Sequence, residues 1–318
     1  MKIILAKPRG FCAGVTRAIE TVERALAKFG PPIYVRHEIV HNKYVVESLR
    51  QKGAIFVDEV DQIPKDAIVI FSAHGVSDKV EEDALSRGLD VIDATCPLVS
   101  KVHREAKKYE EEDYEIILIG HKGHPEVEGT SGRVKKKVIL VSDEHDARTV
   151  EIKHPEKIAY VTQTTLSVDD TKKIADILEK RFPQMQAGLA TKDICYATQN
   201  RQDAVRELSK MVDMLLVIGA QNSSNSNRLR DLGEECGRRS YLINGAQDID
   251  ASWFAGINAV GLTAGASAPE VLVQEVIEKI KLFAAEGFVD EAAEDVTVQD
   301  MDGIVENVFF ALPRKVRK

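Results

Sequence analysis

The chain is predicted to be an α/β protein made of three similar small lobes, each with a parallel sheet. Short apolar runs alternate with runs of helical spacing along most of the 318 residues, a pattern typical of parallel strands joined by helices. The predicted strands are apolar throughout, as at 117–119 and 215–218, which is expected where helices cover both faces of a sheet. An internal repeat divides this alternation into three.

The repeat begins at three cysteines, Cys12, Cys96 and Cys195. Each precedes a segment of helical spacing, and a buried-strand run begins 21, 20 and 20 residues after the cysteine. A polar loop follows each of these strands, at 37–42, 121–126 and 221–227, and a later strand runs into a second small or polar loop, at 72–77, 163–167 and 264–268. Lobes of about ninety residues are short for independent domains, so they should share buried surface or a cofactor.

The first lobe shows the expected order of elements. Strands are predicted at 3–6, 33–36, 54–57, 67–72 and 91–94, and helices at about 14–28, 42–51 and 78–87. The first helix is supported by apolar residues at helical spacing, namely Ala18, Ile19, Val22 and Leu26. We expect lobes at 1–95, 96–191 and 192–282, with an N-terminal strand that can pair elsewhere, and a tail at 283–318 with a late strand at 306–313.

Composition excludes several classes of protein. The net charge is −8 and only short basic runs occur, so a nucleic-acid binder is not expected. No apolar run approaches the roughly 18 residues of a membrane span. The first residues look like a strand and not a signal peptide, so a cytoplasmic location is expected. Four cysteines without a CxxC pair then argue against disulfides.

The three repeated cysteines are candidate metal ligands. Each lies just before a predicted helix, where the helix N-terminus favours a thiolate. Three buried structural thiols are the alternative, but the repeat favours a shared cofactor. Zinc normally takes a fourth protein ligand and a four-iron cluster four thiolates, so three thiolates leave one position open for chemistry. Cys236 lies outside the repeat and is expected to be a small residue near a helix end.

Polar residues in the repeated loops are candidates for anion binding. Three histidines follow strands, where ligands bind in open α/β sheets. Hydroxyl and amide side chains before helices can form a neutral anion cradle with backbone N–H groups. Surface histidines and ordinary helix caps are the alternatives. The candidates are His41, His74, His124, Ser223, Ser224, Asn225 and Ser267.

Two further residues are candidates for proton transfer and substrate contact. Glu126 follows His124 in GHPEVEGT, and beside histidines it could act as a general acid at neutral pH. Thr164 lies in the loop that corresponds to that of His74. A solvated glutamate and a strand-end threonine are the alternatives.

These segments together resemble one family, the 4-hydroxy-3-methylbut-2-enyl diphosphate reductases, or LytB family. The similar segments are FCAGV, EIVHN, SAHGV, DATCPLV, GHPEVEGT, TQTTLS, ICYATQNRQ, NSSNSNRL and GASAPE, and they extend from Arg9 to Glu270. The match does not include Cys236 or the acidic tail after Glu286.

The resemblance implies a monomeric trefoil around one [4Fe-4S] cluster, held by Cys12, Cys96 and Cys195 with one iron not ligated by protein. It implies diphosphate binding by the histidines, serines and asparagine above, contact of Thr164 with the substrate hydroxyl, and proton delivery by Glu126. The implied reaction removes the allylic hydroxyl with two electrons and two protons and gives isopentenyl and dimethylallyl diphosphate. A ferredoxin or flavodoxin would supply the electrons.

Two other functions are compatible with the same residues. One is a zinc-dependent hydrolase of phosphate esters with histidine ligands, which would be colourless and insensitive to air. The other is a non-catalytic protein that senses iron–sulfur status or binds a phosphorylated metabolite. A visible absorption spectrum of anaerobically purified protein separates a cluster protein from the hydrolase, and a turnover assay separates an enzyme from the sensor.

Overall fold

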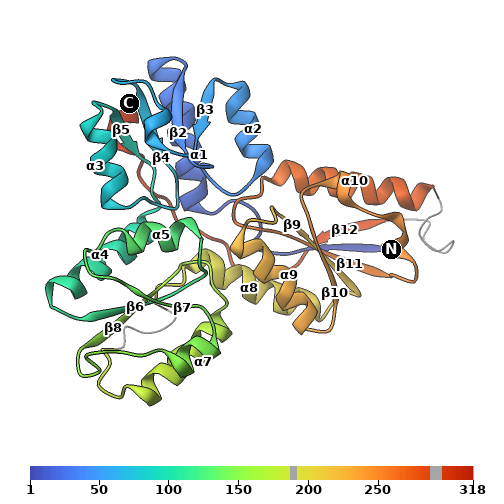
Figure 1. Cartoon of the computed structure of the whole chain (residues 1–318). Helices are drawn as coiled ribbons and strands as arrows, with labels where there is room; N and C mark the ends of the chain where they lie inside the picture. Colours follow the sequence, from blue (N-terminus) through green and yellow to red (C-terminus); the bar gives the residue numbers. More distant parts are fainter. Residues whose placement is uncertain (187–191, 287–295, 318) are drawn as a thin grey trace. The chain divides into compact units, whose positions relative to one another are not determined.

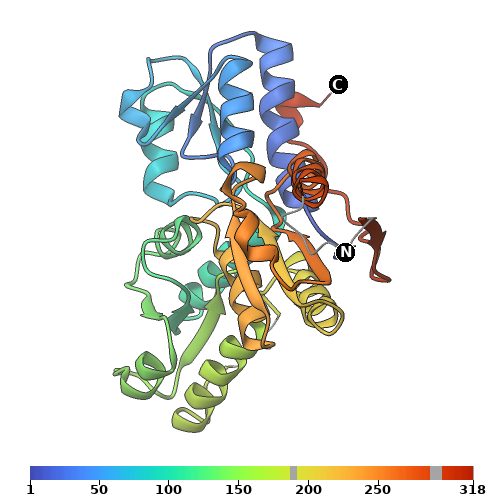
Figure 2. The ribbon, with the colours of Figure 1, turned by 90° about the vertical axis from the view of Figure 1, so that its right-hand side faces the viewer.

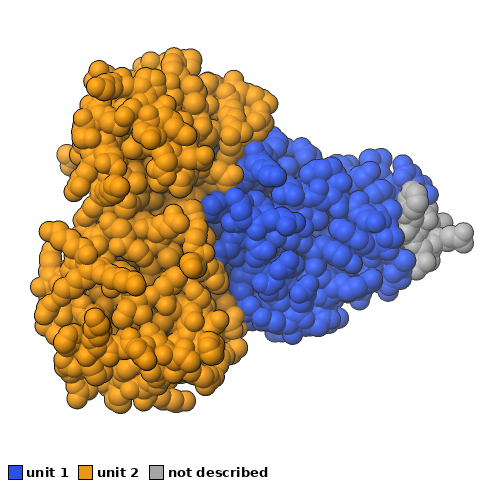
Figure 3. Space-filling model, viewed as in Figure 1, with its two compact units in different colours: residues 1–13, 41–45, 196–309 blue, residues 14–40, 46–195, 310–318 orange. Residues whose placement is uncertain are grey.

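The computed structural model describes residues 1–186, 192–286 and 296–317. The chain forms two compact units, shown in different colours in Figure 3. Unit 1 comprises residues 1–13, 41–45 and 196–309, and unit 2 comprises 14–40, 46–195 and 310–318. Among the described residues, no helix combines the length and apolar character needed to cross a membrane.

Unit 1 contains a five-stranded parallel sheet with strand order β10-β9-β11-β1-β12. The strands are β1 (Lys2–Leu5), β9 (Met214–Ile218), β10 (Arg239–Ile243), β11 (Ala259–Ala264) and β12 (Thr297–Asp300). In Figure 1, α10 (Glu270–Ala285) lies on one face of this sheet, and α8 (Tyr196–Ser209) and α9 (Ser224–Glu235) lie on the other. Buried apolar side chains of these helices pack against the strands. Figure 2 shows α10 nearly end-on. Burial on both faces explains why the central strands β1, β9 and β11 carry apolar runs.

Unit 2 contains two parallel sheets, with strand orders β3-β2-β4-β5 and β7-β6-β8. The strands are β2 (Ile33–Arg36), β3 (Ala54–Val57), β4 (Ile68–Phe71), β5 (Asp90–Asp93), β6 (Glu115–Ile119), β7 (Ile139–Val141) and β8 (Ile158–Thr162). The helices are α1 (Ala13–Phe29), α2 (Lys43–Gln51), α3 (Asp78–Ser86), α4 (Pro97–Glu111), α5 (Pro125–Ser131), α6 (Glu144–Thr149) and α7 (Val168–Arg181). Separate apolar clusters lie beside the two sheets.

The strand orders show where the repeat closes. In the four-stranded sheet, β5 lies beside β4 and leads directly to Cys96. In the five-stranded sheet, β1 takes the same place beside β11 and leads to Cys12. In the third sheet, Gln186 forms a parallel bridge with Ala159 of β8, and the chain reaches Cys195 after residues 187–191, which lie outside the described part. The N-terminal strand therefore completes the sheet formed by residues from the last third of the chain.

Most predicted elements are present, and the α/β class with three small parallel sheets is confirmed. The helices expected near 14–28, 42–51 and 78–87 correspond to α1, α2 and α3. The prediction of a strand at 306–313 is wrong, because that segment has no regular secondary structure and Phe309 is 90% exposed. The late strand of the tail is instead β12. Two other expected features, residues 287–295 of the acidic tail and the lobe end at 191, lie outside the described residues.

Candidate active site

The backbone of each repeated cysteine is held in the same way. Each cysteine N–H donates a hydrogen bond to a carbonyl of the polar loop that follows the neighbouring strand. The three bonds run from Cys12 to Ala266 (3.1 Å), from Cys96 to Ala73 (2.9 Å) and from Cys195 to Thr164 (3.1 Å). Because the acceptors occupy corresponding loops, the sequence repeat is reproduced at the level of single hydrogen bonds.

The three cysteines also share a helix N-terminal position. Cys96 is the N-cap of α4, with Pro97 as the first helical residue, while Cys12 and Cys195 immediately precede α1 and α8. All three are partly buried, and none of them forms a disulfide. The helix N-terminus stabilises a thiolate, which is the form that binds a metal. Cys236 is also free, but it is exposed at the C-terminal end of α9, which agrees with its expected place near a helix end.

Unit 1 contains Cys12 and the candidate residues His41, Ser223, Ser224, Asn225 and Ser267. The Ser267 hydroxyl donates to the His41 carbonyl at 2.9 Å, and the His41 ring shares a 3.3 Å hydrogen bond with the side chain of Asn222. The structure therefore brings the loops at 41, 221–227 and 264–268 together within this unit.

The start of α9 has an unusual buried amide. Ser223 caps the helix, and its hydroxyl accepts hydrogen bonds from the N–H and the hydroxyl of Ser226. Asn225 is only 4% exposed, and neither polar atom of its side chain has a hydrogen-bond partner among the described residues. A buried unpaired amide costs roughly 1–3 kcal/mol, so such a group indicates a place for a polar ligand.

Glycines keep space open next to this amide. A Cβ on Gly265 would lie 2.1 Å from the Ser226 hydroxyl and 3.5 Å from the Asn225 side-chain nitrogen. A Cβ on Gly219 would lie 2.2 Å from the same hydroxyl. The serine pair can therefore cap α9 only because both positions lack a side chain. Neutral donors at the beginning of a twelve-residue helix suit a phosphate group.

Unit 2 contains Cys96, Cys195 and the other candidates. Glu126 is 6% exposed. Its carboxylate accepts a 2.8 Å hydrogen bond from the Thr164 backbone N–H and another from the Thr164 hydroxyl, also at 2.8 Å. Because the Thr164 carbonyl accepts from the backbone N–H of Cys195, Thr164 contacts both the acid and the backbone of one candidate cysteine.

The two histidines of this unit lie next to the acid. The rings of His74 and His124 meet edge to face with centroids 6.1 Å apart. The Nδ1 atom of His124 accepts from the Glu126 N–H at 3.1 Å, and that of His74 shares a 3.2 Å hydrogen bond with the Ser72 hydroxyl. These bonds orient both rings and direct their Nε2 atoms away from these partners.

A tight turn follows His74. Gly75 has a φ of +81°, and a Cβ there would lie 2.5 Å from the His103 ring. Burial lowers the pKa of His103 to about 4, with Arg133 adding to the effect and Asp93 opposing it. His103 is therefore a neutral packing residue at neutral pH.

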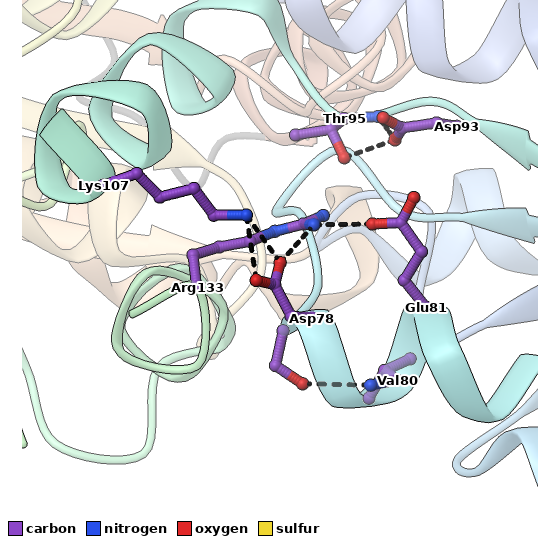
Figure 4. A network of polar contacts seen from close by, with 8 residues as sticks. Asp78, Val80, Glu81, Asp93, Thr95, Lys107 and Arg133 are labelled. Atoms are coloured by element: carbon purple, nitrogen blue, oxygen red, sulfur yellow. Dashed lines mark hydrogen bonds and ion pairs between the residues drawn. The ribbon is translucent and has the colours of Figure 1, made fainter. Parts of the chain in front are cut away.

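An ionic network connects the two sheets of unit 2 (Figure 4). Asp78 of α3 bonds to Lys107 of α4 at 2.9 Å and to Arg133, just after α5, at 2.8 Å. Arg133 also pairs with Glu81 at 2.6 Å. Partial burial opposes the charge of Asp78, but both cations outweigh it and lower its pKa. The network holds the start of α3, which follows the His74 loop, against the elements around Glu126.

One buried side chain in this region was not identified from the sequence. The side-chain oxygen Oε1 of Gln163 accepts from the His121 N–H at 3.0 Å, and its side-chain nitrogen Nε2 donates to the Thr165 hydroxyl at 2.8 Å. It links the loop of His124 to the loop of Thr164. Its position directly before Thr164 in TQTTLS was the available signal, but a glutamine in a polar loop does not by itself indicate burial.

The candidates thus form one set in each unit. Unit 1 offers a thiol and a neutral anion cradle, and unit 2 offers two thiols, two imidazoles and a carboxyl–hydroxyl pair. Within the described ranges, no group of three or more His, Cys, Asp or Glu side chains is close enough to hold a metal ion. The chemistry of the donors, three partly buried cysteines at helix N-termini that form no disulfide, fits an iron–sulfur cluster.

Comparisons with known proteins agree over the whole chain. The model of the LytB protein family matches residues 3–281. The 4-hydroxy-3-methylbut-2-enyl diphosphate reductases of Acinetobacter baylyi and Pseudomonas aeruginosa are each 56% identical over 321 aligned positions, covering 100% of this chain and 98% and 99% of theirs. The structure of the E-1-hydroxy-2-methyl-but-2-enyl-4-diphosphate reductase from Plasmodium falciparum is 39% identical, with a TM-score of 0.90 over 99% of this chain and 96% of that chain.

Proposed function

Because the chain belongs to the LytB protein family, we propose that it reduces 4-hydroxy-3-methylbut-2-enyl diphosphate. The reaction replaces the allylic C–O bond by a C–H bond. Two electrons and two protons enter, water leaves, and isopentenyl and dimethylallyl diphosphate are the products. A solved relative, 34% identical with a TM-score of 0.64, is described as the terminal enzyme of the non-mevalonate pathway, and this chain is assigned to the same step.

The identical anchoring of three cysteine backbones carries the proposal. Cys12 of unit 1, together with Cys96 and Cys195 of unit 2, would hold one [4Fe-4S] cluster, with one iron not ligated by protein. When bound, such a cluster supplies single electrons and a Lewis-acidic iron for the substrate oxygen. The role of the protein is to hold three thiolates in order and to leave room beside them.

The neutral cradle would bind the diphosphate. Ser223, Ser224, Asn225 and Ser267 provide hydroxyl and amide donors, and His41, His74 and His124 provide ring nitrogens. In unit 1, the unpaired amide of Asn225 supports this assignment most directly, because a phosphate oxygen and a bridging hydroxyl or water can satisfy it. Anchoring the diphosphate limits the movement of the hydroxyl and so raises its effective concentration at the reacting centre.

Glu126 would deliver the proton that lets the hydroxyl leave as water. Its carboxylate is buried and holds the Thr164 hydroxyl at 2.8 Å. A threonine hydroxyl can accept a proton from the acid and pass its own proton to a substrate oxygen, so the pair can act as a short relay. Thr164 would also contact the substrate hydroxyl directly.

Three further expectations belong to the proposal. The electron donor is a ferredoxin or flavodoxin, the enzyme is a monomer, and it acts in the cytoplasm. Turnover with each reduced donor, with dithionite plus a viologen as reference, tests the first. Light scattering of the anaerobic protein tests the second, and localisation of a tagged chain tests the third.

The decisive experiment combines a spectrum with turnover. Protein purified without oxygen should be brown, lose its colour in air and convert the allylic diphosphate to the two isoprenoid products. Cys12→Ser, Cys96→Ser and Cys195→Ser should each lose iron and activity, whereas Cys236→Ser should keep both. Full iron content after loss of one of the three would exclude the ligand assignment, and a stable cluster without turnover would favour a sensor.

A further inference from the structure

A fully buried arginine holds the chain next to Cys12. Arg201 of α8 is 0% exposed. Its guanidinium donates to the Gly10 carbonyl at 2.7 Å and 3.2 Å, and to the Ala197 carbonyl of its own helix at 2.9 Å. A buried guanidinium is tolerated only when its donors are satisfied and its charge is paired, so these contacts require an acidic partner.

The C-terminal segment supplies that partner. Glu306 accepts from Arg201 through both carboxylate oxygens, at 3.0–3.3 Å, and from the Asn200 side chain at 2.9 Å. The Glu306 side chain is only 12% exposed although it lies in a segment without regular secondary structure. After Met301, whose N–H still bonds to the Leu5 carbonyl, this part of the segment is held by side-chain contacts such as the charge pair and not by a strand ladder.

The contact determines how the Cys12 loop is held. Gly10 has a φ of +69°, its N–H donates to the Ala264 carbonyl at 3.0 Å, and the Cys12 N–H donates to the Ala266 carbonyl. One side of the loop is thus bonded to the chain around the end of β11. The carbonyl of Gly10 accepts from Arg201, and Arg201 is charge-paired with Glu306.

Unit 2 contains the corresponding arrangement next to Cys96. Arg17 of α1 donates to the Thr95 carbonyl at 2.9 Å, one residue before the cysteine, and to the Ala311 carbonyl of the C-terminal segment, also at 2.9 Å. Burial lowers the pKa of Arg17, while the nearby Asp93 and Cys96 act in the opposite direction. In both units, an arginine joins a carbonyl just before a cysteine to the C-terminal segment.

We propose that residues 301–317 are a clamp that holds the cysteine loops. Two positioning residues connect it to them: Arg201 joins Glu306 to the loop before Cys12, and Arg17 joins Ala311 to the loop before Cys96. This rests on the proposed function, in which both cysteines hold the cluster. The clamp lies outside every substrate motif, so its loss should loosen the cysteine loops while leaving the diphosphate cradle intact.

The first test measures the loop without the cluster. Amide hydrogen exchange of residues 6–13 in the cluster-free protein should accelerate roughly tenfold to hundredfold in Arg201→Lys, because charge-assisted hydrogen bonds to the Gly10 carbonyl are lost. Glu306→Gln, which removes the charge partner of the buried guanidinium, should accelerate the same exchange by a smaller factor. Arg206→Lys is the matched control, since Arg206 lies on the same helix and its pair with Asp203 is exposed. Exchange in 214–218 should equal that of the parent in all variants.

The second test measures the loaded protein. After anaerobic reconstitution, both variants should lose the cluster absorbance in air several times faster than the parent and the control, and Arg17→Lys should do the same relative to Arg24→Lys. Unchanged exchange in 6–13, or faster exchange with parental cluster lifetime, would overturn the clamp. A parent that takes up no cluster would instead refute the proposed function, and the exchange result would still report on the loop.

Discussion

Replacing Asn225 with alanine should separate stability from binding. The side chain is buried and its two polar atoms lack partners among the described residues, so the ligand-free protein carries a desolvation cost of roughly 1–3 kcal/mol for each atom. Asn225→Ala removes that cost and adds only the loss of a small packed group. We therefore expect the free energy of unfolding of the ligand-free protein to stay constant within about 1 kcal/mol or to increase.

The affinity for the substrate, in contrast, should decrease in Asn225→Ala. A hydrogen bond to a charged group contributes about 1.5–3 kcal/mol, so loss of the amide donor should weaken substrate binding roughly tenfold to 150-fold. Anaerobic calorimetric titration with the allylic diphosphate measures the affinity, and denaturant unfolding of the ligand-free protein measures the stability. The cluster spectrum should remain that of the parent.

Asn227 of the same helix is the matched control. Its side-chain nitrogen already donates to the carbonyls of Gln221 and Ser223, at 2.7 Å and 2.9 Å. Asn227→Ala should therefore lower the free energy of unfolding by about 1–2 kcal/mol. If Asn225→Ala destabilises the protein as much as Asn227→Ala does and leaves the affinity unchanged, the unpaired amide is not a ligand site and the reasoning fails.

Two further substitutions test unit 2. Glu126→Gln keeps the shape of the side chain and can still form hydrogen bonds with Thr164, but it carries no transferable proton. Steady-state turnover with an artificial reductant should therefore fall about 10²–10⁴-fold, while substrate still perturbs the cluster spectrum. Near-parental turnover would place the proton source elsewhere. Because the folded pKa of His103 is lowered from 6.5 to about 4, its contribution to stability is present above pH 6.5 and is lost as the pH falls toward 4, by up to about 3 kcal/mol. His103→Gln should flatten that part of the pH–stability curve measured by denaturant unfolding, and an unchanged slope would contradict the buried neutral assignment.

Much of the fold could be predicted because the signals are local. A buried parallel strand requires an apolar run and a helix requires apolar spacing, and both are visible in any short window. The repeat added the long-range information, because it identified corresponding loops. The contact between Glu126 and Thr164 follows from it: the two residues are 38 positions apart, yet each occupies a polar loop at the end of a neighbouring strand.

The prediction failed where local sequence and tertiary contact disagree. Residues 306–313 are apolar enough for a strand, but Phe309 is exposed and the segment is held by Glu306 and Ala311 on two arginines. The actual strand, β12, reads TVQD, and all four residues are exposed at the edge of its sheet. No apolar signal marks such a strand. Arg201 was missed for a related reason, because charged residues are expected on the surface.

The position of β1 between β11 and β12 has a consequence for synthesis of the chain. β1 has no neighbour in its sheet until residues about 250 positions later have been translated, which at 5–20 residues per second takes roughly 10–50 s. The sheets of unit 2 pair strands close in sequence and can form much earlier. The segment with Cys12 therefore lacks its sheet neighbours during the time in which the sheets of unit 2 can form. Binding of the proposed cluster should accordingly follow synthesis of β11, and a chaperone that shields residues 2–12 should raise the yield of holoprotein.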